Sequence, residues 1–178
     1  ISRSFTVTVN PVNDTPTLNT LSNVSVNEDA STQTANLSGI SSGAANESQS
    51  LIVTATSSNT GLIPNPTVNY TSPNATGSIA FTPVASASGS ATITVTVNDG
   101  GSSNNVISRS FTVTVNSVND TPTLNTLSNL SINQNASSQT VNLSGVSSGA
   151  ANENQTLTVT ATSSNTGLIP NPSVNYTS

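Results

Sequence analysis

Apolar and polar residues alternate one by one along several short stretches of the chain. In residues 93–97 (ITVTV) and 111–115 (FTVTV), every second residue is apolar and the residues between are threonines. A period of two turns one side of a strand toward a core and the other toward water, as in an antiparallel β-sandwich. No window has the period of an amphipathic helix. Further strands are predicted at residues 51–55 and 24–26 and, on weaker alternation, at 78–81 and 31–37, with a core that contains Phe81, Ile93, Val95, Phe111 and Val113.

The chain also repeats itself over a much longer distance. Residues 1–72 and 107–178 are identical at 60 of 72 aligned positions, with an offset of 106 residues. Solenoid repeats have periods of roughly 20–50 residues, whereas an immunoglobulin-like sandwich needs about 100. We therefore predict an all-β protein made of tandem immunoglobulin-like or cadherin-like antiparallel β-sandwiches, each about 106 residues long.

Differences between the two copies support the assignment of inward and outward positions. Val24 is replaced by Leu130 in the second copy, so an inward position keeps an apolar residue. Ile52 is replaced by Thr158, and Ile52 has the opposite phase to Leu51 and the other inward residues of its strand. An outward position tolerates such an exchange, so the predicted phase is consistent with both copies.

Turn-forming residues divide the chain into repeats. The segments Val12–Pro16 and Val118–Pro122 both read VNDTP, and Asn, Asp and Pro favour turns over strand interiors. We predict that residues 1–12 are the last strand of a preceding repeat with its linker and that 13–116 form one complete sandwich. Residues 117–178 are then a linker and the first part of the next repeat.

These motifs resemble the tandem cadherin-like and immunoglobulin-like repeats of large bacterial surface proteins of the adhesin type. The resemblance rests on TVTVNDGG at Thr94–Gly101, SRSFTVTVN at Ser108–Asn116 and Ser2–Asn10, and the two VNDTP linkers. It implies secretion, long arrays at the cell surface and a role as a stalk or filament whose partners are neighbouring repeats. It also implies calcium at the domain junctions in some members.

Composition excludes several other classes of function. Two basic residues face seven acidic ones, which gives a net charge of −5, and such a chain cannot neutralise a nucleic-acid backbone. Because Cys, His and Lys are absent, the chain lacks thiol nucleophiles, zinc fingers and an activating base for a serine or threonine nucleophile. No apolar run approaches the roughly 18 residues of a membrane span. We therefore predict a non-enzymatic protein without nucleic-acid binding or membrane insertion in this segment.

Calcium at the linker is the best candidate for a specific site. Calcium takes six to eight oxygen ligands from carboxylates, amides and backbone carbonyls. The second copy lacks two of the carboxylates, because Gln134 and Asn135 replace Glu28 and Asp29. Alternatively, the acids cap turns or lie in solvated loops, and the NDGG segment around Asp99 forms a hairpin turn. The predicted ligands, expected to meet near one end of the sandwich, are Asn13, Asp14, Glu28, Asp29, Asp99 and, in the second linker, Asp120.

Two other functions compete with a stalk. A carbohydrate- or partner-binding module would rely on Tyr70, because Phe81 and Phe111 are predicted in the core and sugar sites favour exposed aromatic rings. A self-assembling filament would use the segment Ile1–Asn10 of one chain to complete the sheet of another copy. The absence of Lys favours such association, because lysines commonly protect sheet edges.

Overall fold

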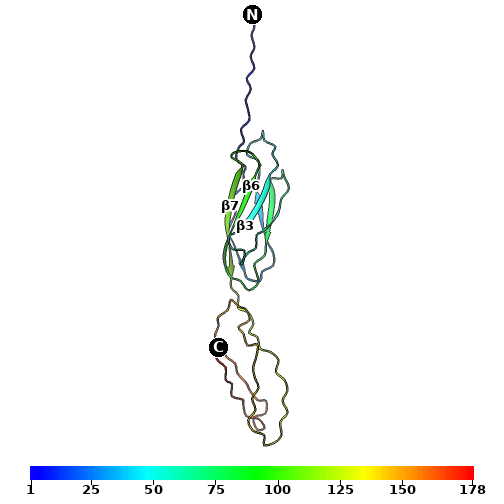
Figure 1. The fold of residues 1–178 in the computed structure, drawn as a ribbon, viewed down its shortest axis with the longest axis vertical. Helices are drawn as coiled ribbons and strands as arrows, with labels where there is room; N and C mark the ends of the chain where they lie inside the picture. The colour runs from blue at the N-terminus through cyan, green and yellow to red at the C-terminus, as the bar shows by residue number, and fades with distance from the viewer. The chain divides into compact units, whose positions relative to one another are not determined.

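The computed structural model describes all residues 1–178, and the chain divides into two compact units, 1–117 and 118–178. All regular secondary structure lies in the first unit and consists of strands; the structure has no helix (Figure 1). The strands are β1 (Val24–Asn27), β2 (Gln33–Ser38), β3 (Ile52–Ser57), β4 (Thr67–Asn69), β5 (Thr76–Phe81), β6 (Gly89–Asn98) and β7 (Val106–Asn116). It contains no helix long and apolar enough to cross a membrane.

The seven strands form two sheets that pack as a sandwich. One sheet has the order β1-β7-β6-β3 and the other the order β2-β5-β4. All pairings are antiparallel except that of β1 with β7, which is parallel. Consecutive strands lie in different sheets except for two antiparallel hairpins, β4–β5 and β6–β7, and connections that cross between the sheets are typical of immunoglobulin-like domains. The predicted all-β sandwich is confirmed, while β4, with a single apolar residue, was not predicted.

Alternating side chains from both sheets fill the core. Along β6, the alternate residues from Ala91 to Val97 are buried, and the threonines between them face outward. The rings of Phe81 on β5 and Phe111 on β7 lie 6.4 Å apart and join the two sheets. The predicted phase of β3 is also confirmed, because Leu51 and Val53 are buried whereas Ile52 is 62% exposed. All five predicted core residues are buried: Phe81, Ile93, Val95, Phe111 and Val113.

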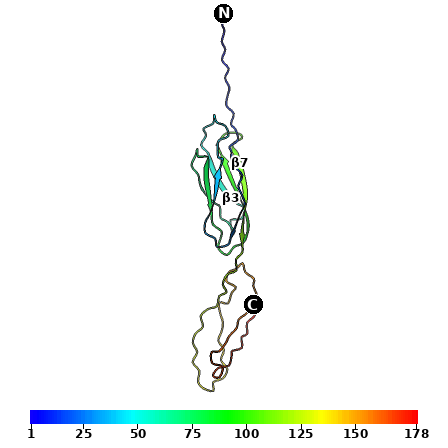
Figure 2. The same cartoon turned by 180° about the vertical axis from the view of Figure 1, so that it is seen from behind.

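The first unit has two poles, at opposite ends of β7. The linker pole contains Asn13, the β6–β7 turn of residues 99–105 and the loop of residues 41–50. The exit pole contains the β1–β2 turn at Glu28 and Asp29, together with Asn116 at the end of β7. Ten residue steps along β7 separate the poles by about 33 Å. The chain therefore enters this unit at one end and leaves it at the other (Figures 1 and 2).

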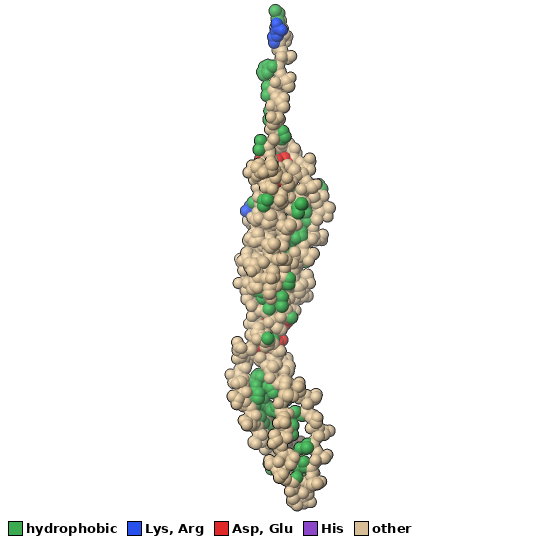
Figure 3. Space-filling view, viewed as in Figure 1, with side chains coloured by type: hydrophobic (Ala, Val, Ile, Leu, Met, Phe, Trp, Pro, Cys, Tyr) green, Lys and Arg blue, Asp and Glu red, His purple; other side chains and the backbone are tan.

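Two segments that resemble parts of this sandwich do not form strands. Residues 1–12 are extended and have no strand partner, and Figure 3 shows their apolar side chains on the surface. Residues 118–178 have turns and one isolated bridge between Thr123 and Ser147, which matches the bridge between Thr17 and Ser41 in the first unit. Their apolar side chains Leu130, Ile132 and Leu168 are exposed.

Candidate functional site

The linker is attached to the linker pole through the side chain of Asn13. Its Nδ2 atom donates to Oδ2 of Asp99 at 3.1 Å and to the backbone carbonyl of Ser103 at 3.0 Å. Its Oδ1 atom accepts a hydrogen bond from Nε2 of Gln49 at 2.7 Å. Asp99 is buried, and its Oδ1 atom accepts from the amide of Gly101 at 2.8 Å. One amide side chain thus connects the linker with both the β6–β7 turn and the loop that contains Gln49.

A second attachment joins Asp14 to the same loop. The amide of Asp14 donates to Oε1 of Glu47 at 2.8 Å, and Oε2 of Glu47 accepts from the amide of Ala44 at 3.4 Å. Gly43 has a φ of +117°, and a Cβ atom there would lie 2.8 Å from the carbonyl oxygen of Thr15. The loop can approach the linker this closely because this position is glycine.

The contacts between the linker and the loop recur in the second unit. Nε2 of Gln155 donates to Oδ1 of Asn119 at 2.6 Å, and the amide of Asp120 donates to Oε1 of Glu153 at 2.6 Å. The hydrogen bond from the Asp120 amide is the main reason why the pKa of Glu153 is lowered. Because this unit has no strands, the linker and its loop assemble these contacts without a finished sheet.

The predicted calcium ligands do not come together at one place. Asn13, Asp14 and Asp99 lie at the linker pole, whereas Glu28 and Asp29 lie at the exit pole, where the amide of Glu28 donates to the carbonyl of Asn116 at 2.9 Å. Asp120 belongs to the second unit. The structure has no group of three or more His, Cys, Asp and Glu side chains arranged to hold a metal ion. The five residues predicted for the first linker do not fit a single calcium site, so the expectation that they meet near one end is corrected.

Asp29 has a structural role that explains its exchange between the repeats. Its φ is +58°, and that of Asn135, at the equivalent position, is +65°. Asp and Asn are the non-glycine residues that most readily adopt this left-handed conformation. Oδ1 of Asp29 also accepts a hydrogen bond from the amide of Ser86 at 3.0 Å. The exchange of Asp for Asn therefore keeps the turn while it removes a charge.

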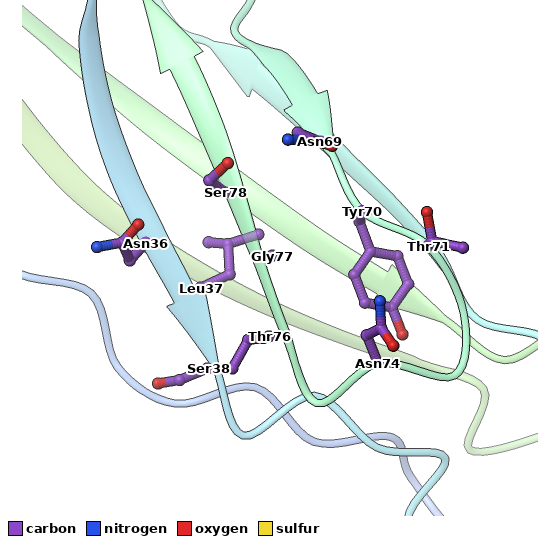
Figure 4. A pocket seen from close by; sticks show the side chains of 10 residues that line it. All are labelled: Asn36, Leu37, Ser38, Asn69, Tyr70, Thr71, Asn74, Thr76, Gly77 and Ser78. Carbon is purple, nitrogen blue, oxygen red and sulfur yellow. The ribbon is translucent and has the colours of Figure 1, made fainter.

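Tyr70 lines an open depression of about 480 Å³ over β2, β4 and β5 (Figure 4). Its ring packs beside Gly77, where a Cβ atom would lie 3.1 Å from Cδ2 of Tyr70. The residue is half-buried against the core, and burial raises the pKa of its phenol, an effect that Ser72 partly offsets. One side of the ring is thus covered by the protein, whereas a sugar-binding platform presents an exposed aromatic ring.

The first and last strands of the sandwich form a continuous parallel ladder. Residues Val24–Asn27 of β1 pair with 113–116 of β7. The ladder is extended at one end by Asn23, whose Oδ1 accepts from the amide of Thr112 at 2.8 Å, and at the other by the amide of Glu28. Nδ2 of Asn116 also donates to Oγ of Ser25 at 3.1 Å. The first and last strands of this unit are therefore bonded directly to each other.

Sequence reasoning missed Glu47 and Gln49, because one carboxylate and one amide in a polar loop look like ordinary surface residues. A usable signal exists, since Glu47 and Gln49 are both retained as Glu153 and Gln155 while Ser48 between them changes to Asn154. The parallel pairing of β1 and β7 leaves no comparable mark on the sequence.

Comparisons with known proteins give only distant similarities. No family model matches the sequence, and no curated protein matches it. Among solved structures, titin domains Z1 and Z2 in complex with telethonin have 15% identity and a TM-score of 0.42 over 66% of this chain and 55% of theirs. Domains 4 and 5 of the S-layer protein SbsC have 20% identity and a TM-score of 0.36, over 56% of this chain and 53% of that one. A structure of SbsC domains 4–9 has 20% identity and a TM-score of 0.36, covering 67% of this chain and 17% of that one. The chain thus spans about half the length of the titin chain and of the SbsC chain with domains 4 and 5, and a smaller share of the longer SbsC chain.

Proposed function

We propose that the chain is a structural segment of a large secreted bacterial surface adhesin, in which repeated sandwiches form a stalk or filament outside the cell. In this proposal the repeats are not enzymes, and their partners are neighbouring repeats. The observation that carries the proposal is the direct pairing of β1 with β7, because these strands follow the linker at one pole and precede the exit at the other.

The direction of the strands decides how this pairing responds to tension. A pull on both linkers draws β1 toward the linker pole and β7 toward the exit pole. Since the strands are parallel, the pull shears them lengthwise and loads all four residue pairs of the ladder together. A pull across the strands would instead break hydrogen bonds one after another. The sandwich therefore resists extension where a stalk needs resistance.

Attachment of the linker supports the same function. The contacts of Asn13, Asp14, Glu47 and Gln49 recur with an offset of 106 residues, so each repeat carries its own anchor for the preceding linker. Because the linker is held through both Asn13 and Asp14, it can extend little before a pulling force reaches the sandwich. The outer face of β6 and β7 carries hydroxyl groups, such as Oγ1 of Thr96 and Oγ of Ser108, which lie 2.8 Å apart. This uncharged surface suits a fibre that is exposed to changing salt and pH.

Single-molecule pulling on the two ends of the full chain tests the proposal. The amide of Glu28 points to β7, so alternation places the amide of Val26 on the same side and that of Asn27 on the other. Val26→Pro removes a donor of the sheared ladder and lowers the force that unfolds the first unit below that of Val26→Ala, which loses the same core contacts but keeps the donor. Asn27→Pro leaves a higher force, because its amide does not point to β7. Equal unfolding forces for the two proline variants would contradict a mechanical role of this ladder.

A carbohydrate- or partner-binding module is the alternative from another class, and Tyr70 provides its test. If the chain is only a spacer, the wild type and Tyr70→Ala bind neutral polysaccharides equally weakly, because a spacer does not use the tyrosine ring for binding. Binding of the wild-type chain to a glycan array, lost in Tyr70→Ala and kept in the folded control Ser102→Ala at an exposed position outside this depression, would favour the binding module over the stalk.

A further inference from the structure

β3 is an edge strand with one side open. It pairs with β6 on one side only, where the amide of Ser58, just after the strand, donates to the carbonyl of Thr92 at 2.9 Å. Because successive amides of a strand point to opposite sides, the amides of residues 51, 53, 55 and 57 point away from β6. Such a row of donors can pair with a strand of another molecule.

Two side chains occupy the ends of this row. Oδ1 of Asn65 accepts from the amide of Ser57 at 2.9 Å, and Oγ of Ser72 accepts from the amide of Leu51 at 3.0 Å. Asn65 precedes β4 and Ser72 follows it, so the two acceptors bracket β3 from the neighbouring segment. Between them, only the amides of Val53 and Ala55 are left on this side.

The second unit repeats both contacts in the absence of a sheet. Oδ1 of Asn171 accepts from the amide of Ser163 at 2.8 Å, and Oγ of Ser178 accepts from the amide of Leu157 at 3.0 Å. No strand is present in this unit, so the contacts are not a consequence of sheet pairing. The segment makes both contacts locally, without a paired strand beside it.

The usual protections of an edge are missing from β3. The strand IVTATS contains no charged residue and no proline, and the chain has no Lys at all. We propose that Asn65 and Ser72 close the free edge of β3 against pairing with the same edge of a second copy of this chain. Two β3 edges are compatible partners, because an antiparallel pair related by a twofold axis brings no like charges together. With both end amides occupied, the two middle amides are too few for a stable added strand.

Sedimentation of the full chain over a range of concentrations tests this inference, which does not depend on the proposed function. The variant Asn65→Ala/Ser72→Ala opens the edge and shifts the mass distribution toward twice the 17.8 kDa of the chain at concentrations where the wild type is unchanged. The rescue variant Asn65→Asp/Ser72→Thr keeps an acceptor at both positions and sediments like the wild type. The matched control Asn36→Ala/Ser102→Ala removes exposed side chains of the same types elsewhere and also sediments like the wild type.

A third change locates the contact. Thr54 is exposed on β3, so Thr54→Lys in the opened variant places a charge on the edge and restores the wild-type distribution. Circular dichroism confirms that each variant keeps its strands. An opened variant that is folded and sediments like the wild type would overturn the proposal, as would association that Thr54→Lys does not reverse.

Discussion

The same ten residues, ISRSFTVTVN, occur at 1–10 and at 107–116 with opposite outcomes. In the second position they form most of β7, and Phe111 is 3% exposed between the sheets. In the first position they form no strand, and Phe5 is 89% exposed. Alternation therefore gives a segment the capacity to be a strand, and its neighbours β1 and β6 make it one. The complete sandwich, and not the ten-residue segment alone, is therefore the unit that folds.

The sharpest way to break this comparison is to remove the same ring from each copy. Phe111→Ala leaves a cavity between the sheets and lowers the free energy of unfolding of the first unit by about 3–5 kcal/mol. Phe5→Ala changes it by less than about 0.5 kcal/mol, since the ring is exposed. Chemical denaturation followed by circular dichroism measures both, and similar losses would show that residues 1–10 are packed.

A second matched pair compares the two units. Leu62 is 3% exposed, whereas its counterpart Leu168 is 75% exposed. Leu62→Ala is expected to cost about 2–5 kcal/mol of stability, and Leu168→Ala less than about 0.5 kcal/mol. Thermal melts of the full chain check this, and a large loss from Leu168→Ala would mean that the second unit has a packed core of its own.

The contact between Asp120 and Glu153 in the second unit is expected to depend on pH. Because the pKa of Glu153 is lowered by its hydrogen bond with the Asp120 amide, the contact is fully present above the ordinary pKa of a glutamate and is lost as the pH falls through the lowered value. Acidification, and Glu153→Gln at neutral pH, are expected to weaken protection of the Asp120 amide severalfold against hydrogen exchange. Protection of the Asp120 amide that is independent of pH and of Glu153→Gln would contradict the contact.

The smallest expected effect concerns Tyr70. Burial raises the pKa of this phenol, so the folded state disfavours the phenolate. Above the ordinary pKa of about 10, the unfolded chain ionises first and stability falls as the pH rises further. Tyr70→Phe removes this alkaline loss and changes stability at neutral pH by about 1 kcal/mol or less. Parallel alkaline melts of the two proteins measure the difference.

Most of the fold could be predicted because burial leaves a period of two in β3, β6 and β7. β4 was missed because Thr67–Asn69 holds one apolar residue between polar neighbours, too few for a pattern. The parallel register of β1 against β7 depends on contacts between residues about 90 positions apart, which alternation does not encode. At the site, Asn13 and Asp14 were identified by their turn chemistry, but their partners Glu47 and Gln49 could be found only through their retention in both repeats.

The role of the acidic residues was harder to predict, because the same carboxylate oxygens can accept hydrogen bonds in a turn or bind a metal ion. Asp29 adopts a positive φ and accepts an amide, so its presence is explained by the turn alone. Asp99 was predicted both as a turn residue and as a calcium ligand. The turn prediction is confirmed, since the amide of Asp99 donates to the carbonyl of Asn105 and Gly100 has a φ of +76°.

Hydrogen exchange by NMR compares the two copies of the ten-residue segment most directly. The amides of residues 6–9 and 112–115 have the same flanking residues, so their intrinsic exchange rates are the same. If partners in the module make the strand, the amides of 112–115 that bond within the sheet exchange only on opening of the first unit, and those of 6–9 exchange at the rate of an unfolded peptide. Equal protection of the two segments would contradict the account, because the strand would then form from its own sequence or from pairing outside the module.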